Sequence, residues 1–137
     1  MKKQRDIRVI IAGGGTGGHI FPAIAIANAL KKLQPSCTIL FVGAKGKMEM
    51  EKVPKAGYEI IGLDIAGFNR SNLWKNISLP FKLWKSFMQA KKVIQQFKPT
   101  VAVGVGGYAS FPLLFMAQRI KIATIIQEQN SYAGKSN

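Results

Sequence analysis

The feature that most constrains this chain is a glycine-rich stretch, GGGTGGH at residues 13–19, which lies between segments of different periodicity. Residues 7–12 before it are apolar and rich in β-branched side chains, which predicts a short buried strand. After it, Pro22 suits the first turn of a helix. Apolar residues then recur at helical spacing, at Ala23, Ile26, Ala27, Leu30 and Leu33.

Such a junction can bind an anion. Glycines let the backbone approach a ligand closely, and the N–H groups and dipole at a helix N-terminus favour negative charge. The stretch therefore predicts contact with a phosphate or nucleotide, and a plain tight connection between strand and helix is the alternative. His19, the only histidine of the chain, falls at this junction.

The remaining pattern predicts an α/β fold with a doubly wound parallel sheet, in one Rossmann-like domain over residues 1–137. Further strands are expected at 38–42, 58–65, 100–105 and 122–126. Helices are expected at 47–56, at 72–97 with a break or new start at Pro80, and at 112–118.

An uncharged run at 99–118 is long enough to raise the question of a membrane span, but its central glycines favour strand, loop and short helix. The charged N-terminus predicts no signal peptide.

Three loops should meet at the carboxyl edge of this sheet, where such folds bind ligands. They are the stretch at 13–19, a second glycine loop at 104–110, and the corner at 127–130. No acidic residue occurs between Ile20 and Met48, which argues against the ribose-binding acid of an NAD enzyme and leaves NADP barely open. Glu128 is the only acid expected near this edge.

Positive charge predicts anionic partners. The net charge is +14, and nine Lys or Arg residues with no Asp or Glu lie between Ile65 and Gln127. Such a field attracts nucleic acid, anionic lipid headgroups or phosphorylated substrates, without choosing among them.

The helix expected around residues 79–97 carries two sets of apolar residues. One set makes a core-facing stripe: Leu79, Leu83, Phe87, Ala90, Ile94 and Phe97. The other set lies off that stripe: Trp74, Phe81, Trp84 and Met88, interleaved with Lys75, Lys82 and Lys85. Two interpretations stay open, an interfacial membrane patch or a wide buried face with lysine stems packed along it. Nucleic acid is less favoured, because these aromatic residues follow a helix and not a groove or sheet platform.

Taken together, the motifs resemble the MurG family of glycosyltransferases. GGTGGHIFPA at 14–23, GVGGYAS at 104–110, and QEQN at 127–130 followed by AG at 133–134 occur in the order and spacing of that family. VPKAGY at 53–58 is also similar. Two departures are Phe111, where a small residue is expected, and Gln127, where histidine is common.

The resemblance implies a GT-B glycosyltransferase, in which two Rossmann-like domains face a cleft. This chain would be the N-terminal, acceptor-side domain, without the C-terminal domain that supplies most of the sugar-nucleotide pocket. The implied reaction moves N-acetylglucosamine from UDP-N-acetylglucosamine to the C4 hydroxyl of N-acetylmuramic acid in lipid I, with inversion, and gives lipid II for peptidoglycan. No metal or other cofactor is implied. The implied location is peripheral, on the anionic cytoplasmic face of the bacterial inner membrane.

The same resemblance implies roles for particular residues. His19 would be the general base or an orienting group, and Glu128 a fallback base or a structural hydrogen-bond acceptor. A helix N-terminus would keep the His19 ring neutral and able to accept a proton. Donor contacts would come from Thr16, Gly17, Gly18 and Asn130. The acceptor diphosphate would lie on Gly106, Gly107, Tyr108 and Ser110. The membrane patch would be Trp74, Lys75, Phe81, Lys82, Trp84 and Lys85.

A rival hypothesis is a stand-alone Rossmann-like module that binds a nucleotide or polyanion without catalysis. The absent second domain favours the module, and the three converging loops favour the transferase.

Overall fold

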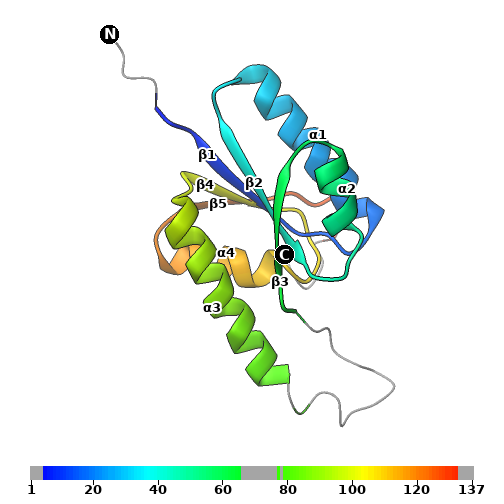
Figure 1. The fold of residues 1–137 in the computed structure, drawn as a ribbon, viewed down its shortest axis with the longest axis vertical. Helices are drawn as coiled ribbons and strands as arrows, with labels where there is room; N and C mark the ends of the chain where they lie inside the picture. Colours follow the sequence, from blue (N-terminus) through cyan, green and yellow to red (C-terminus); the bar gives the residue numbers. More distant parts are fainter. Residues whose placement is uncertain (1–4, 66–76, 78, 133–137) are drawn as a thin grey trace.

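A five-stranded parallel sheet forms the centre of the molecule in the computed structural model, which describes residues 5–65, 77 and 79–132 (Figure 1). The strand order is β3-β2-β1-β4-β5. The strands are β1 (Arg8–Ala12), β2 (Thr38–Ala44), β3 (Glu59–Leu63), β4 (Val101–Gly104) and β5 (Ala123–Ile126). The predicted doubly wound α/β fold is confirmed.

In the described part of the chain, four helices cover the two faces of the sheet (Figure 1). They are α1 (Gly17–Leu33), α2 (Glu49–Lys55), α3 (Leu79–Phe97) and α4 (Ser110–Arg119). Side chains alternate along the central strand, so Val9 and Ile11 pack in a core with α1 and α2. Ile10 and Ala12 pack in a second core with α3 and α4.

The strand order changes direction beside β1. The chain passes from β1 to β2 on one side, and later returns to place β4 on the other side of β1. In open parallel sheets this switch point opens a crevice between the loops that follow the two strands. Here those loops are the two glycine-rich loops.

The start of α1 differs from the expectation. The helix begins at Gly17, so Pro22 lies in its second turn and not in its first. Glycine has no Cβ, and Gly17 and Gly18 continue the strand-to-helix turn directly into the helix. Pro22 has no N–H to donate to the carbonyl group of Gly18, one turn earlier.

The stripe predicted on α3 is buried only toward its C-terminal end. Ala90 and Ile94 are buried in the core, whereas Leu83 is 39% exposed. Figure 1 shows the reason, because the first turns of α3 extend beyond the carboxyl ends of the strands. Pro80 lies in the first turn of α3, which confirms the alternative of a new start there.

Candidate functional site

Backbone hydrogen bonds join the loops that follow β1, β4 and β5. The amide of Gly14 donates to the carbonyl oxygen of Gly106 at 3.0 Å. The amide of Gln127 donates to the carbonyl oxygen of Gly104 at 2.8 Å. The three loops predicted to meet at the carboxyl edge therefore lie beside one another.

The two glycine loops approach so closely that side chains are excluded between them. A Cβ atom on Gly107 would lie 2.2 Å from the carbonyl oxygen of Gly14. One on Gly106 would lie 2.8 Å from Nε2 of His19. Both Gly106 and Gly107 have positive φ, 95° and 90°, which favours glycine independently of the space.

His19 lies in the first turn of α1, with its ring over the second glycine loop. Its Nδ1 is 3.0 Å from the carbonyl oxygen of Gly14 and 3.2 Å from Oγ1 of Thr16. A carbonyl oxygen can only accept, so we assign the ring proton to Nδ1. The neutral ring then carries its lone pair on Nε2, the nitrogen that lies beside Gly106.

The predicted donor-contact residues lie around the N-terminus of α1. Thr16 is the N-cap residue and is exposed, and Gly17 and Gly18 are the first two helical residues. Amides in the first turn of a helix have no acceptor within the helix, so they are available to an anion. The corner after β5 reaches the same place, because a Cβ on Gly18 would lie 3.8 Å from Nε2 of Gln129.

Glu128 and Asn130 are bonded to each other at that corner. Oε1 of Glu128 accepts from the backbone amide of Asn130 at 3.0 Å and from its side-chain amide at 2.9 Å. Oε1 of Glu128 is thereby engaged by Asn130. Asn130 remains exposed.

The second glycine loop presents one side chain outward and one inward. Tyr108 is 54% exposed. Ser110 is buried, and among the described residues its hydroxyl has no hydrogen-bond partner. Gly106 is also buried and Gly107 is half-buried, so Tyr108 is the exposed member of the four residues predicted to contact the acceptor diphosphate.

Two further acidic residues at the carboxyl ends of the strands, Glu49 and Asp64, correct the expectation that Glu128 is the only one. Glu49, the first residue of α2, is 1% exposed beneath the first glycine loop. Its Oε2 accepts from the amide of Gly15 and its Oε1 from the amide of Ala44, each at 2.9 Å. The sequence signal for Glu49 is local: it is an acidic residue that opens a helix five positions after the end of β2, directly after the segment 20–48 that has no acidic residue.

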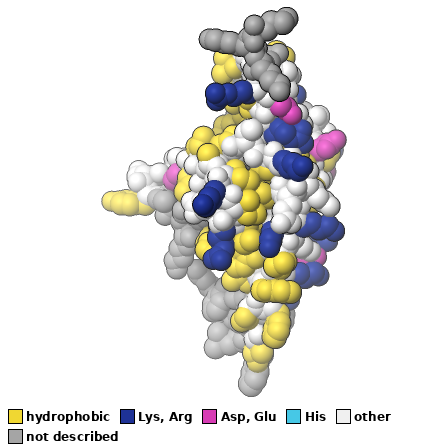
Figure 2. All heavy atoms as spheres, turned by 90° about the vertical axis from the view of Figure 1, so that its left-hand side faces the viewer, with side chains coloured by type: hydrophobic (Ala, Val, Ile, Leu, Met, Phe, Trp, Pro, Cys, Tyr) yellow, Lys and Arg dark blue, Asp and Glu magenta, His cyan; other side chains and the backbone are white. Residues whose placement is uncertain are grey.

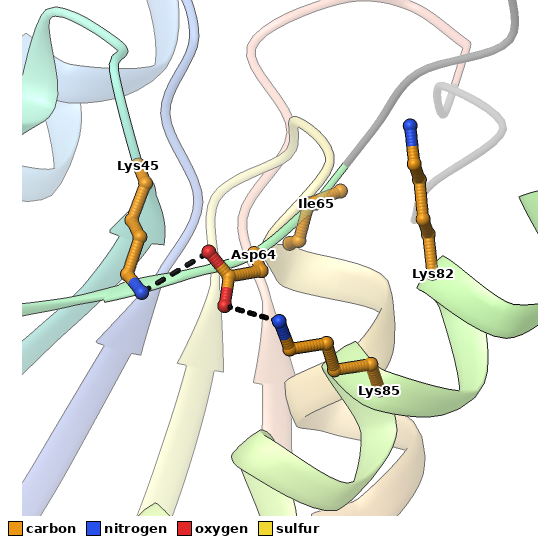
Figure 3. A pocket seen from close by; sticks show the side chains of 5 residues that line it. All are labelled: Lys45, Asp64, Ile65, Lys82 and Lys85. Atoms are coloured by element: carbon orange, nitrogen blue, oxygen red, sulfur yellow. Dashed lines mark ion pairs between the residues drawn. The ribbon is translucent and has the colours of Figure 1, made fainter.

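A pocket of about 300 Å³ lies between the end of β3 and α3, lined by lysines around one carboxylate (Figure 3). Asp64 lies 3.0 Å from Nζ of Lys45 and 3.1 Å from Nζ of Lys85, and it accepts from Nε2 of Gln89 at 2.7 Å. The hydrogen bond from Gln89, and after it the two ammonium groups, hold the pKa of the Asp64 carboxyl well below its usual range. Lys82 lines the same pocket.

Beside this pocket, aromatic residues of α3 lie open to solvent. Phe81 is 79% exposed and Trp84 is 65% exposed, and with Pro80 they line an apolar hollow. The interpretation of a wide buried face is therefore wrong for these two residues. Trp74 and Lys75 lie outside the described residues. Figure 2 shows apolar side chains gathered at the lower end of this face, with Lys and Arg side chains above and beside them.

Two kinds of feature are absent from the part of the chain that the structure describes. It contains no cluster of His, Cys, Asp and Glu residues able to hold a metal ion. Within the same residues, no helix is long and apolar enough to cross a membrane.

A family model and curated relatives match the sequence of this chain. The model of the glycosyltransferase family 28 N-terminal domain matches residues 9–137. A UDP-N-acetylglucosamine–N-acetylmuramyl-(pentapeptide) pyrophosphoryl-undecaprenol N-acetylglucosamine transferase of Bacteroides fragilis is 63% identical over 131 residues, 96% of this chain and 34% of that enzyme. The enzyme of the same name from Cytophaga hutchinsonii is 57% identical over 137 residues, all of this chain and 37% of that enzyme. The chain spans about a third of the length of these curated relatives.

Solved structures of glycosyltransferases superpose on this chain. MurG of Acinetobacter baumannii superposes with a TM-score of 0.82 at 32% identity, over 96% of this chain and 38% of that one. The glycosyltransferase VinC, solved with dTDP, has a TM-score of 0.63 at 9% identity, over 89% of this chain and 34% of that one, a likeness of fold alone.

Proposed function

This chain belongs to the family of glycosyltransferase family 28 N-terminal domains, and on that premise we propose that it is the acceptor-side domain of an inverting glycosyltransferase. The proposed enzyme transfers N-acetylglucosamine from UDP-N-acetylglucosamine to the C4 hydroxyl of N-acetylmuramic acid in lipid I. The product is lipid II, the precursor of peptidoglycan. The names of relatives 57–63% identical to this chain support this choice of substrates.

The observation that carries the proposal is the position of His19 between the two glycine loops. Its Nδ1 is engaged by Gly14, and its Nε2 lies beside Gly106 with a lone pair available. A hydroxyl attacking a sugar needs a group that accepts its proton as the new bond forms. Nε2 is placed to do this for an acceptor bound over the second loop.

In the proposed step, the C4 oxygen of the acceptor attacks the anomeric carbon of the donor and its proton passes to Nε2 of His19. UDP leaves with the electron pair of the broken glycosidic bond. Orientation of the hydroxyl by a hydrogen bond is the second role open to the same nitrogen.

The two substrates are assigned to different parts of the site. Thr16, Gly17, Gly18 and Asn130 contact the donor sugar nucleotide, which the C-terminal domain of the longer enzyme would hold from across the cleft. The acceptor diphosphate lies against the amides of Gly106 and Gly107 and the hydroxyl of Tyr108, near the N-terminus of α4.

The exposed face of α3 is the proposed membrane contact. Phe81 and Trp84 enter the interface of the cytoplasmic leaflet, and Lys82 binds its anionic headgroups together with Lys85, which is also paired with Asp64. This arrangement brings the carboxyl edge of the sheet to the surface where a lipid-linked acceptor resides.

Substitution of His19 in the full-length enzyme tests the proposal. His19→Ala should lower kcat by about a hundredfold to ten-thousandfold, the usual contribution of a general base, with an unchanged circular dichroism spectrum. Leu33→Ala, at an 80% exposed position near the end of the same helix, is the matched control and should keep full activity. Near-normal turnover in His19→Ala would exclude both roles.

A further inference from the structure

We infer that Glu49 is a positioning residue for His19 and acts on it through a single peptide group. Its effect on catalysis depends on the proposed function, whereas the hydrogen-bonded relay itself can be measured without any reaction. The relay runs from the Glu49 carboxylate through the Gly14–Gly15 peptide to the imidazole ring.

The two hydrogen bonds of the relay belong to opposite sides of the same amide. The N–H of Gly15 donates to Oε2 of Glu49 at 2.9 Å. The C=O of Gly14, which is the other half of that peptide group, lies 3.0 Å from Nδ1 of His19. The peptide is trans and planar, so its N–H and C=O point in opposite directions, one to the carboxylate and one to the ring.

Glu49 is held in place by more than this bond. Its side chain is 1% exposed, and its second oxygen accepts from the amide of Ala44 at 2.9 Å. Two glycines make room for it, since a Cβ on Gly14 or on Gly43 would lie 2.4 Å from its side-chain carbons. The carboxylate therefore fixes the end of β2 and the first glycine loop together.

A carboxylate that accepts from a peptide N–H polarises the amide and strengthens its C=O as an acceptor. The stronger acceptor favours the ring proton on Nδ1 and leaves the Nε2 lone pair toward Gly106. A flip of this peptide would break both hydrogen bonds at once. Gly14 and Gly15 have φ of 141° and 87°, and glycine can adopt many other backbone conformations at these positions. The hydrogen bond to Glu49 therefore holds the Gly14–Gly15 peptide group in one of its possible orientations.

The relay can be observed in the unaltered chain by NMR, because His19 is its only histidine. Nitrogen-15 histidine labelling gives one pair of ring signals, and at a pH where the ring is neutral we expect the protonated nitrogen to be Nδ1. Free histidine in water prefers Nε2–H, so this result is diagnostic. Scalar couplings across the two hydrogen bonds, from Gly15 N to the Glu49 carboxyl carbon and from His19 Nδ1 to the Gly14 carbonyl carbon, should be detectable. A dominant Nε2–H tautomer without these couplings would overturn the inference, and this measurement needs no variant to fold.

The variant that tests the cause is Glu49→Gln. A glutamine has one accepting oxygen and one donating NH₂ group, so it cannot accept from both Gly15 and Ala44. We expect the ratio of Nδ1–H to Nε2–H to fall about tenfold, which corresponds to the loss of the hydrogen bond from Nδ1 to the carbonyl oxygen of Gly14. Glu51→Gln is the matched control, since it removes the same charge from the exposed side of the same helix and should leave the ratio unchanged. An unchanged ratio in folded Glu49→Gln would overturn the relay.

Measurement of kcat in the full-length enzyme distinguishes a failure of this inference from a failure of the proposed function. In the full-length enzyme, Glu49→Gln should lower kcat about tenfold with little change in KM, because the ring is misdirected while the substrate contacts remain. If the enzyme transfers no N-acetylglucosamine at all, the proposed function fails while the NMR result for the relay stands. If it is active and Glu49→Gln matches Glu51→Gln in kcat, the catalytic consequence of the relay is refuted.

Discussion

Gly107 and Gly14 are the residues through which the two glycine loops touch. The space between them is set by backbone atoms, because a Cβ on Gly107 would meet the Gly14 carbonyl at 2.2 Å. That carbonyl is also the acceptor for Nδ1 of His19. Packing, loop conformation and ring orientation therefore depend on one oxygen atom.

Substitution of Gly107 by alanine should separate close contact from backbone conformation. Both Gly107 and Gly46 have positive φ, 90° and 74°, and alanine costs about 1–2 kcal/mol in that region at either site. Gly46 has no atom within 4 Å of its Cβ position, so Gly46→Ala should show that cost alone. Gly107→Ala should lower the free energy of unfolding by about 1–3 kcal/mol more, the cost of overpacking. Urea unfolding measures both, and equal losses would contradict the contact.

At the scale of elements, Asp64 links β3 to α3. It lies at the end of β3 and receives Lys85 and Gln89 from α3 and Lys45 from the turn after β2. Residues 64–78 separate β3 from α3 in the sequence, and this cluster connects the end of β3 directly to α3. The first turns of α3 carry the exposed aromatic residues, so the cluster also sets the position of the proposed membrane contact.

The stability that Asp64 contributes should depend on pH in a definite direction. Its pKa in the folded chain lies below its ordinary value, so the contribution is fully present above the unfolded pKa of about 3.9 and is lost as pH falls through the folded pKa. Asp64→Asn should therefore be less stable than the original chain at pH 7, and the two should converge as the pH is lowered below about 4. Denaturant unfolding across this range measures the difference. A difference that stays constant with pH would mean that packing, and not charge, ties the elements together.

At the scale of the whole molecule, charge and exposed aromatic surface coincide on one region. The net charge is +14, and Lys82 and Lys85 flank the exposed Phe81 and Trp84. Each feature alone is common on protein surfaces, but together they are typical of a face that binds an anionic interface.

Binding to vesicles tests that face. The chain should co-sediment with vesicles that contain anionic lipid, more weakly as salt is raised, and little with neutral ones. Replacing both Phe81 and Trp84 by serine should weaken binding at least tenfold, because two aromatic anchors are lost. Leu33→Ser removes an equally exposed apolar side chain from α1 and should leave binding unchanged. Equal binding to neutral and anionic vesicles, or no effect of the double substitution, would contradict the proposal.

The sequence by itself determined the order and type of the elements, because hydrophobic periodicity and glycine placement are local properties. Residues 7–12 and 38–42 alone predicted two of the strands, and the glycine loops marked the carboxyl edge. The motifs also sufficed to predict the family. Helix starts were less well determined, since Gly17 opens α1 only through the backbone geometry of the preceding loop.

Only the tertiary structure decided which side chains and loops contact one another and which stay exposed. Glu49 is locally only an acidic residue that opens a short helix, yet the connection from β2 to α2 places it against a loop 34 residues earlier in the chain. The exposure of Phe81 and Trp84 was likewise undecided, because helical periodicity gives a face but not what covers it. Burial, the place of Gly106 beside the His19 ring, and the hydrogen bond from Gly15 to Glu49 depend on contacts between residues distant in sequence, and such contacts exist only once the sheet has formed.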